Sequence, residues 1–185
     1  MTASGSLEFW KFAVKLKTEP RKGWTHGPEI ERIESVADHS FGVAILCLLE
    51  ATARGYDVGR ALALALLHDI EESVIGDLTP QDKKKLASGG LYSMKVRARS
   101  KILRTVPRER KPEFRRLWTD LDRGKTKEAR LVKDLDKLEM ALQASQYESL
   151  GTPHSFLVKF YKSAMTRISD DSMKRIIRKL GNRRN

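Results

Sequence analysis

Cysteine is almost absent from this chain, and it has no long apolar run. Cys47 is the single cysteine among 185 residues, which excludes an intramolecular disulfide framework and favours a reducing compartment. The longest apolar runs, residues 43–49 and 61–67, are too short to span a bilayer. The first residues also lack the basic segment and apolar stretch of a secretory signal. We therefore expect a cytoplasmic protein with no membrane partner.

Strand-like alternation with turn punctuation is missing too, which bears on the fold. Apolar residues recur with a helical period nearly throughout, and this predicts an all-α fold. No internal repeat or low-complexity linker divides the chain, so we expect a single-domain helical bundle over residues 1–185. Its core spans about residues 7–148, followed by C-terminal helices and a basic tail at residues 153–185. The expected helices are residues 7–17, 36–54, 60–72, 80–87, 91–105, 107–121, 126–147, 153–168 and 171–180.

Two local signals define helix starts. A long polar connection, residues 19–34, leads to Ser35 and Asp38, which have capping-box spacing with Asp in place of the usual Glu. A helix should therefore begin near residue 36. Thr79 is a candidate cap for the short helix that follows it. A connection as long as residues 19–34 in a compact domain is often functional.

The charge is strongly basic and unevenly distributed. Lys and Arg number 36 against 24 Asp and Glu, which gives a net charge of +12. Residues 95–117 contain ten basic and two acidic residues, and residues 174–184 add six basic residues and no acid. Residues 69–82, in contrast, contain five carboxylates and no base, which suggests a bound cation. The basic segments either attract anionic partners or form solvated helix faces, and the second explanation is the commoner one.

Three residues in the first half are candidates for metal chemistry. His39 has valines three positions before it and four positions after it on the expected helix, so its ring should face the interior. A core histidine bonded to a backbone carbonyl is the alternative interpretation. His68 and Asp69 follow an apolar run directly. Because isolated buried carboxylates are costly, a compensating charge is expected beside them.

The long helix at residues 126–147 offers two further carboxylates. Asp134 has Arg130 and Lys137 at helical spacing, so a surface ion pair explains it. Asp136 has apolar residues four positions on either side, which makes it the better candidate for an inward-facing ligand. Two imidazoles and two carboxylates suit an octahedral Mn, Co or Fe ion, and Mg and Zn also fit. Such an ion lowers the pKa of a bound water and so supplies a nucleophile near neutral pH.

His39, the adjacent pair His68–Asp69 and the distant Asp136 form an H…HD…D pattern. Together with the segments 16–24, 34–40, 66–72, 75–80 and 131–138, it resembles the HD-domain metal-dependent phosphohydrolases, most closely their 5′-deoxynucleotidase branch. The resemblance implies an HD-type helical bundle, one divalent metal and hydrolysis of nucleoside 5′-monophosphates. It also implies a homodimer, because family members are commonly dimers. The metal ligands that it implies are His39, His68, Asp69 and Asp136.

The resemblance also assigns roles around the metal. A glutamate three residues after the HD aspartate matches Glu72, which would position or deprotonate the attacking water. The alternative interpretation of Glu72 is a carboxylate that faces solvent. We expect Glu71, one residue earlier, to face solvent. Arg21 matches a phosphate-binding arginine, Trp24 a tryptophan beside the sugar, and Asp77 a carboxylate near the sugar hydroxyls. Packing for Trp24 and turn capping for Asp77 are the alternatives. The implied catalytic residues are Glu72 and Arg21, and the implied substrate contacts are Arg21, Trp24, Asp77, Leu78, Thr79 and Pro80.

Two other functions compete with a monophosphatase. One is an HD phosphohydrolase that acts on a nucleoside triphosphate or a phosphodiester. The other is a nucleic-acid-binding module with a vestigial metal site, which would use residues 95–116 and the basic tail. The complete ligand set and the absence of a recognised nucleic-acid-binding motif favour the enzyme.

Overall fold

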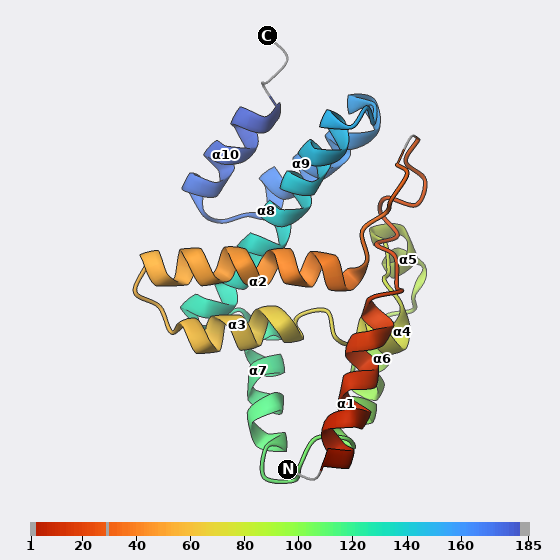
Figure 1. Ribbon diagram of the computed structural model, residues 1–185, viewed down its shortest axis with the longest axis vertical. Helices are drawn as coiled ribbons and strands as arrows, with labels where there is room; N and C mark the ends of the chain where they lie inside the picture. The colour runs from red at the N-terminus through yellow and green to blue at the C-terminus, as the bar shows by residue number, and fades with distance from the viewer. Residues whose placement is uncertain (1–2, 29, 182–185) are drawn as a thin grey trace.

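The computed structural model describes residues 3–28 and 30–181, and its architecture is entirely helical (Figure 1). No named strand occurs in that part of the chain, which confirms the all-α prediction; only an isolated bridge pairs Pro20 with Ser35. The helices are α1 (Ala3–Leu16), α2 (Val36–Ala53), α3 (Val58–Leu67), α4 (Glu72–Ile75), α5 (Pro80–Lys85), α6 (Gly90–Leu103), α7 (Lys111–Arg123), α8 (Lys127–Ser149), α9 (His154–Arg167) and α10 (Asp171–Gly181).

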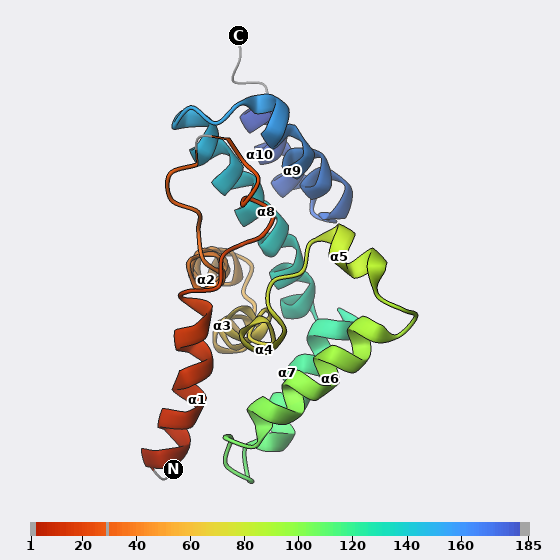
Figure 2. The same ribbon diagram turned by 90° about the vertical axis from the view of Figure 1, so that its right-hand side faces the viewer.

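Helices α2, α3 and α8 form the centre of the bundle. α2 and α3 lie side by side, and α8 crosses both (Figures 1 and 2). α9 and α10 pack at one end of α8, and α1, α6 and α7 lie toward the other. Among the described residues, α2 is the one helix that is long and apolar enough to cross a membrane by length and composition. Here it packs into the core through Val43, Cys47 and Ala51, which are fully buried.

The predicted caps are present. Ser35 Oγ accepts from the Asp38 backbone N–H at 3.1 Å, and Asp38 accepts in return from the Ser35 N–H at 2.9 Å, so this capping box is confirmed. Thr79 and Asp82 form the same arrangement at the start of α5. Each box satisfies backbone donors that the first helical turn leaves free.

The central helix ends earlier than the sequence pattern predicts. α3 stops at Leu67, and residues 68–71 form a turn before α4 starts. The backbone tightens there, since the Glu72 N–H bonds to the carbonyl three residues back, on Asp69, at 3.0 Å. The helix predicted over residues 60–72 is therefore wrong at its C-terminal end. This break rotates the side chains that follow, and it decides where Glu71 and Glu72 point.

The polar connection before α2 is fastened at both ends. The Arg21 N–H bonds to the Glu34 carbonyl at 3.0 Å, and the Val36 N–H bonds to the Glu19 carbonyl at 2.8 Å. Tyr147 on α8 accepts the Glu34 N–H at 2.9 Å. These bonds hold the connection against the bundle and so fix the position of Arg21.

The basic segments lie on the outer helices. Residues 95–117 contribute to α6 and α7, and the basic tail begins within α10. The last two arginines of that tail, Arg183 and Arg184, lie outside the described residues. Arg99 departs from the solvated-face expectation, because it bonds to Glu71 and Asp122 and has a mostly buried side chain.

Candidate metal centre and substrate cleft

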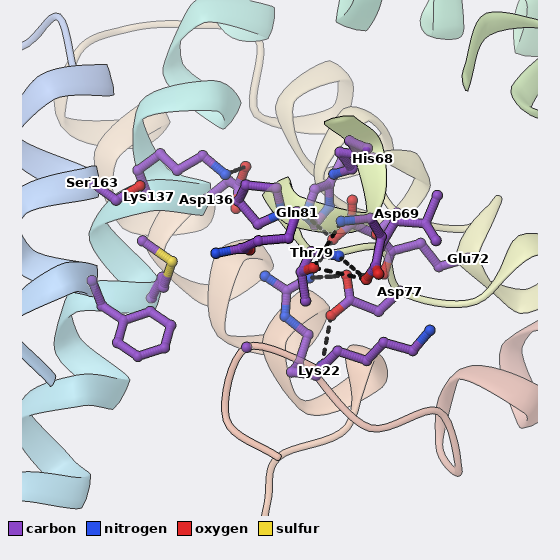
Figure 3. Close-up of a pocket in the computed structure, with 18 of the residues that line it drawn as sticks. Lys22, His68, Asp69, Glu72, Asp77, Thr79, Gln81, Asp136, Lys137 and Ser163 are labelled. Carbon is purple, nitrogen blue, oxygen red and sulfur yellow. Dashed lines mark hydrogen bonds and ion pairs between the residues drawn. The ribbon is translucent and has the colours of Figure 1, made fainter. Parts of the chain in front are cut away.

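The structure brings His39, His68, Asp69 and Asp136 to one point. His39 Nε2 on α2 lies 3.3 Å from His68 Nε2 and 3.3 Å from Asp136 Oδ1 on α8. Asp69 Oδ2 lies 3.2 Å from His68 Nε2 and 3.8 Å from His39 Nε2. His68, Asp69 and Asp136 are labelled in Figure 3. Side chains nearly one hundred positions apart in the chain thus present nitrogen and oxygen atoms to a shared volume.

Both imidazoles turn the same nitrogen toward that volume. His68 Nδ1 bonds to the Ala65 carbonyl at 2.6 Å, and His39 Nδ1 bonds to Glu139 Oε2 at 2.5 Å. In the neutral form that binds a metal each ring carries one N–H, and donation from Nδ1 then leaves the Nε2 lone pair free. Burial and Arg21 lower the pKa of His39, but Asp136 and Glu139 outweigh them and raise it to about 9, so a cation would displace a proton from this ring. The alternative interpretation, a core histidine bonded to a backbone carbonyl, does not describe His39, because its Nδ1 bonds to the Glu139 carboxylate. Nε2 still faces a second histidine and an aspartate.

The two aspartates are held in the ionised form that binds metals. Burial raises the pKa of Asp69, but the neighbouring His68 and Arg21 charges outweigh burial and lower it below its usual value. Burial also raises the pKa of Asp136, but Lys137 and His39 outweigh burial and lower that pKa well below the ordinary range. The two imidazole nitrogens and the Asp136 carboxylate lie close enough together to hold one ion. Asp69 adds a second carboxylate within 3.8 Å of both histidines, and this donor set fits a divalent cation.

Arg21 sits against the carboxylates rather than in open solvent. Its Nη1 lies 3.2 Å from Asp69 Oδ2, 3.8 Å from Glu72 Oε2 and 3.8 Å from Asp77 Oδ1. Asp77 in turn accepts the Lys22 N–H at 2.8 Å, and its own N–H donates to Glu19 at 3.1 Å. Asp77 therefore ties the turn after α4 to the loop that carries Arg21. No sugar is needed to explain its position, and contact with one stays a prediction.

Glu72 and Glu71 point to different places. Oε2 of Glu72 is buried and has no hydrogen-bond partner among the described residues. Burial, together with Asp69 and Asp77, raises the pKa of Glu72 to about 9. Glu71 is only 2% exposed and accepts from Arg99 Nε at 2.7 Å. The expectation that Glu71 faces solvent is wrong, because the break after α3 directs it against α6.

Trp24 is a core residue in this structure. Its ring is 1% exposed, lies 3.8 Å from the Phe160 ring between centroids, and donates from Nε1 to Glu34 Oε1 at 2.6 Å. Packing, the alternative weighed from the sequence, thus accounts for Trp24. Its contact with a sugar stays a prediction.

Asp134 does not form the surface ion pair that its spacing suggested. It is buried and accepts from the Ser169 N–H at 2.9 Å, from Ser169 Oγ at 2.7 Å and from the Asp170 N–H at 3.1 Å. Long-range contacts of this kind are invisible to helical spacing. Asp134 thereby joins α8 to the segment before α10, and Asp136 is the carboxylate that faces the histidines.

A cleft of about 1070 Å³ opens over the cluster. Its walls come from the loop at residues 20–26, the turn at residues 77–83, and helices α6, α7, α8 and α9. Pockets for small ligands typically measure about 300–1,000 Å³, so this cleft is large enough for a ligand the size of a nucleotide. Figure 3 shows Gln81 and Thr79 on one side and Lys137 and Ser163 on the other. The predicted substrate contacts that line this cleft are Arg21, Trp24, Asp77, Leu78, Thr79 and Pro80.

Sequence patterns missed the carboxylates behind His39. Glu139 bonds to His39 Nδ1, and Glu34 lies in the same buried group. Glu139 follows Asp136 by three positions on α8, so its place on the same helix face was a usable signal. Glu34 comes from the polar connection, where no periodicity exists to orient it.

The fold is a helical bundle, and its His and Asp side chains meet beneath a cleft. This combination is typical of helical hydrolases that have a metal site at the centre of the bundle. The family model described as "HD domain" matches residues 13–177. The chain belongs to the HD-domain family, and its fold is of that type.

Named relatives resemble the chain over most of their length. A 5′-deoxynucleotidase HDDC2 from Dictyostelium discoideum is 40% identical over 159 residues, covering 82% of this chain and 80% of the relative. The HDDC2 5′-deoxynucleotidase of Mus musculus is 31% identical and covers 100% of this chain and 90% of its own. A crystal structure of a protein from Pyrococcus horikoshii OT3 has a TM-score of 0.75 at 30% identity, covering 95% of this chain and 98% of that one.

Proposed function

We propose that this chain is a 5′-deoxynucleotidase, a hydrolase that releases orthophosphate from deoxynucleoside 5′-monophosphates. The observation that carries the proposal is the convergence of His39, His68, Asp69 and Asp136 beneath a nucleotide-sized cleft. Relatives named 5′-deoxynucleotidases, similar over four fifths or more of this chain, support the same activity.

The chain's own residues supply binding and proton transfer. Arg21 offers a guanidinium beside Asp69, where it binds phosphoryl oxygens and stabilises the charge that develops on them. Glu72 Oε2 is buried without a hydrogen-bond partner among the described residues. Burial, Asp69 and Asp77 raise the pKa of Glu72 to about 9, and a cation bound beside Asp69 would offset those charges and favour the carboxylate. In that form Glu72 would accept a hydrogen bond from the water that attacks phosphorus and take its proton, which can then pass to the nucleoside 5′-oxygen as its bond to phosphorus breaks. When bound, a divalent ion acidifies water and polarises phosphoryl oxygens. The proposed ligands are His39, His68, Asp69 and Asp136, and the proposed ion is Mn, Co or Fe, with Mg and Zn as further candidates.

Phosphate release from a panel of nucleotides tests the function. The purified protein, supplied with one metal at a time, should release orthophosphate from deoxynucleoside 5′-monophosphates faster than from the ribonucleotides. Asp69→Ala should abolish release, and Asp171→Ala, an exposed carboxylate on α10, should leave it unchanged. Undiminished activity in Asp69→Ala eliminates this site. Triphosphate or an opened diester as product assigns the chain to another HD phosphohydrolase reaction.

We further propose that the enzyme is a cytoplasmic homodimer. Phe41, Ile45, Leu48 and Leu49 are exposed along one stripe of α2, and Leu66 is exposed on the neighbouring α3. A contiguous exposed apolar surface of this kind favours burial against a second copy. The single buried thiol of Cys47 suits a reducing compartment.

A further inference from the structure

We propose that Glu139 is a positioning residue that fixes the tautomer and ring orientation of His39, and that Gly42 is required so that the Glu139 carboxylate fits against α2. The inference rests on the proposed metal site but concerns groups behind it, on the side away from the cleft. Neither residue belongs to the ligand set or to the substrate contacts.

The contact between Glu139 and His39 is short and dry. His39 has no exposed surface, and Glu139 is also buried. Glu139 Oε2 lies 2.5 Å from His39 Nδ1, while His39 Nε2 faces Asp136 and His68. A carboxylate acceptor at Nδ1 retains the hydrogen on that nitrogen and leaves Nε2 as the free electron pair. Partners of this kind orient ligating histidines and tune their basicity.

The two histidines are oriented by different means. His68 donates to the backbone carbonyl of Ala65, which no side-chain substitution removes. His39 depends on one side chain. Asp136 and Glu139 are three positions apart on α8, so one face of that helix supplies both the group in front of His39 and the group behind it.

Gly42 provides an independent indication that this packing is specific. It lies inside α2, one turn after His39, where glycine costs about 0.5–1 kcal/mol of stability relative to alanine. A Cβ atom at this position would lie 2.7 Å from Glu139 Oε1 and 3.0 Å from Glu139 Cγ. Any other residue at position 42 therefore displaces the carboxylate from its seat beside His39.

Glu34 is the third member of the buried cluster that contains His39 and Glu139. Its carboxylate lies with Glu139 and His39 in one buried cluster, and it accepts from Trp24 Nε1 at 2.6 Å. Protein groups, not solvent, thus surround Glu139. Glu139 is the residue that bonds to His39 Nδ1, while Glu34, the other carboxylate of the cluster, bonds to Trp24.

The experiment measures metal affinity and the tautomer separately from activity. Mn²⁺ affinity is determined by competition with a chelating dye. The ¹⁵N shifts of the His39 ring are recorded in metal-free protein above pH 9, where the ring is neutral, because, against burial and Arg21, Asp136 and Glu139 raise the pKa of His39 to about 9. Glu139→Ala should weaken Mn²⁺ binding about 10–100-fold and let His39 populate both tautomers. Glu139→Gln should keep the Nδ1–H tautomer, because its amide oxygen still accepts, and should retain most of the affinity.

Gly42→Ala should reproduce the loss of affinity with Glu139 intact. The matched control is Gly59→Ala on α3, where an added Cβ meets its nearest atom at an ordinary 3.5 Å; its affinity should equal wild type. If Glu139→Ala does not fold by circular dichroism, Gly42→Ala and Glu139→Gln decide the question. Wild-type affinity together with an unchanged His39 tautomer in Glu139→Ala, or in Gly42→Ala, overturns the proposal. A wild-type protein that binds Mn²⁺ but releases no phosphate refutes the proposed function alone.

Discussion

The ion pair between Arg99 and Glu71 makes a stability prediction that can be worked from its geometry. Arg99 Nη2 and Nε each lie 2.7 Å from Glu71 Oε1, and the same guanidinium binds both oxygens of Asp122. This network joins the turn between α3 and α4 to α6 and α7. Arg99→Met keeps much of the side-chain volume and removes the charge. The substitution leaves the buried Glu71 with only a distant and partly exposed partner, the Lys95 ammonium, whose Nζ lies 3.9 Å from Glu71 Oε1.

The loss of folding stability should be large because Glu71 is buried, and most of it should come from Glu71 rather than from the more exposed Asp122. Glu71 is 2% exposed, and removing one partner of a buried pair costs about 3–5 kcal/mol. The side chain of Asp122 is 42% exposed, so its share is about 1 kcal/mol or less. For a chain of this size, 1 kcal/mol lowers the melting temperature by about 2–4 °C, so Arg99→Met should lower it by about 6–20 °C.

Thermal and urea unfolding of matched variants checks this reasoning. Arg110→Met is the control, because Arg110 and Glu113 form an exposed pair at 3.5 Å and should contribute nothing measurable. The double variant Arg99→Met/Glu71→Gln should regain most of the lost stability, since no buried charge is then left unpaired. An Arg99→Met melting temperature equal to that of Arg110→Met would refute the argument.

Three further predictions follow from other parts of the molecule. Phe41→Glu should convert a dimer into a monomer by light scattering without loss of helicity; a dimer of unchanged mass contradicts the proposed interface. Hydrogen bonds from Ser172 and Arg54 lower the pKa of Asp170 below its unfolded value. The contribution of Asp170 to folding stability is therefore fully present above its unfolded pKa of about 4, and it is lost as the pH falls toward the lower pKa that Asp170 has in the folded protein. Asp170→Asn should flatten the acid limb of urea unfolding, and an unaltered limb argues against the assignment. Thr79→Ala removes the cap of α5 at a cost of about 0.5–2 kcal/mol, so amide exchange in residues 81–85 should accelerate while α8 stays protected.

The helical fold and the inward direction of the cluster residues were accessible from local patterns, whereas their meeting at one point was implied by the resemblance to HD-domain phosphohydrolases. Helical periodicity placed His39 on an inward face because valines flank it at helical spacing. The same rule preferred Asp136 over Asp134, since apolar neighbours mark a buried row. An apolar helix that ends in His68 and Asp69 pointed to a charged cluster. Each of these signals acts within a single helix, where spacing fixes direction.

The remaining features depend on contacts between elements, which spacing does not encode. Glu71 faces Arg99 because the helix breaks after Leu67. The break coincides with backbone hydrogen bonds between residues three positions apart, and no residue in this segment is a helix breaker that would predict it. Asp134 is buried by Ser169, thirty-five positions away. The capping box at Ser35 was predictable because both of its members lie within four residues.

The scattered origin of the cluster also sets an order of events during synthesis. α2 and α3 leave the ribosome long before α8, and until α8 docks they hold His39 and His68 without Asp136. A nascent chain arrested before α8 emerges would thus have both imidazoles but no complete cage for an ion. Tight binding of the proposed cation should accordingly be a late step, reached when α8 docks and adds Asp136 to His39, His68 and Asp69.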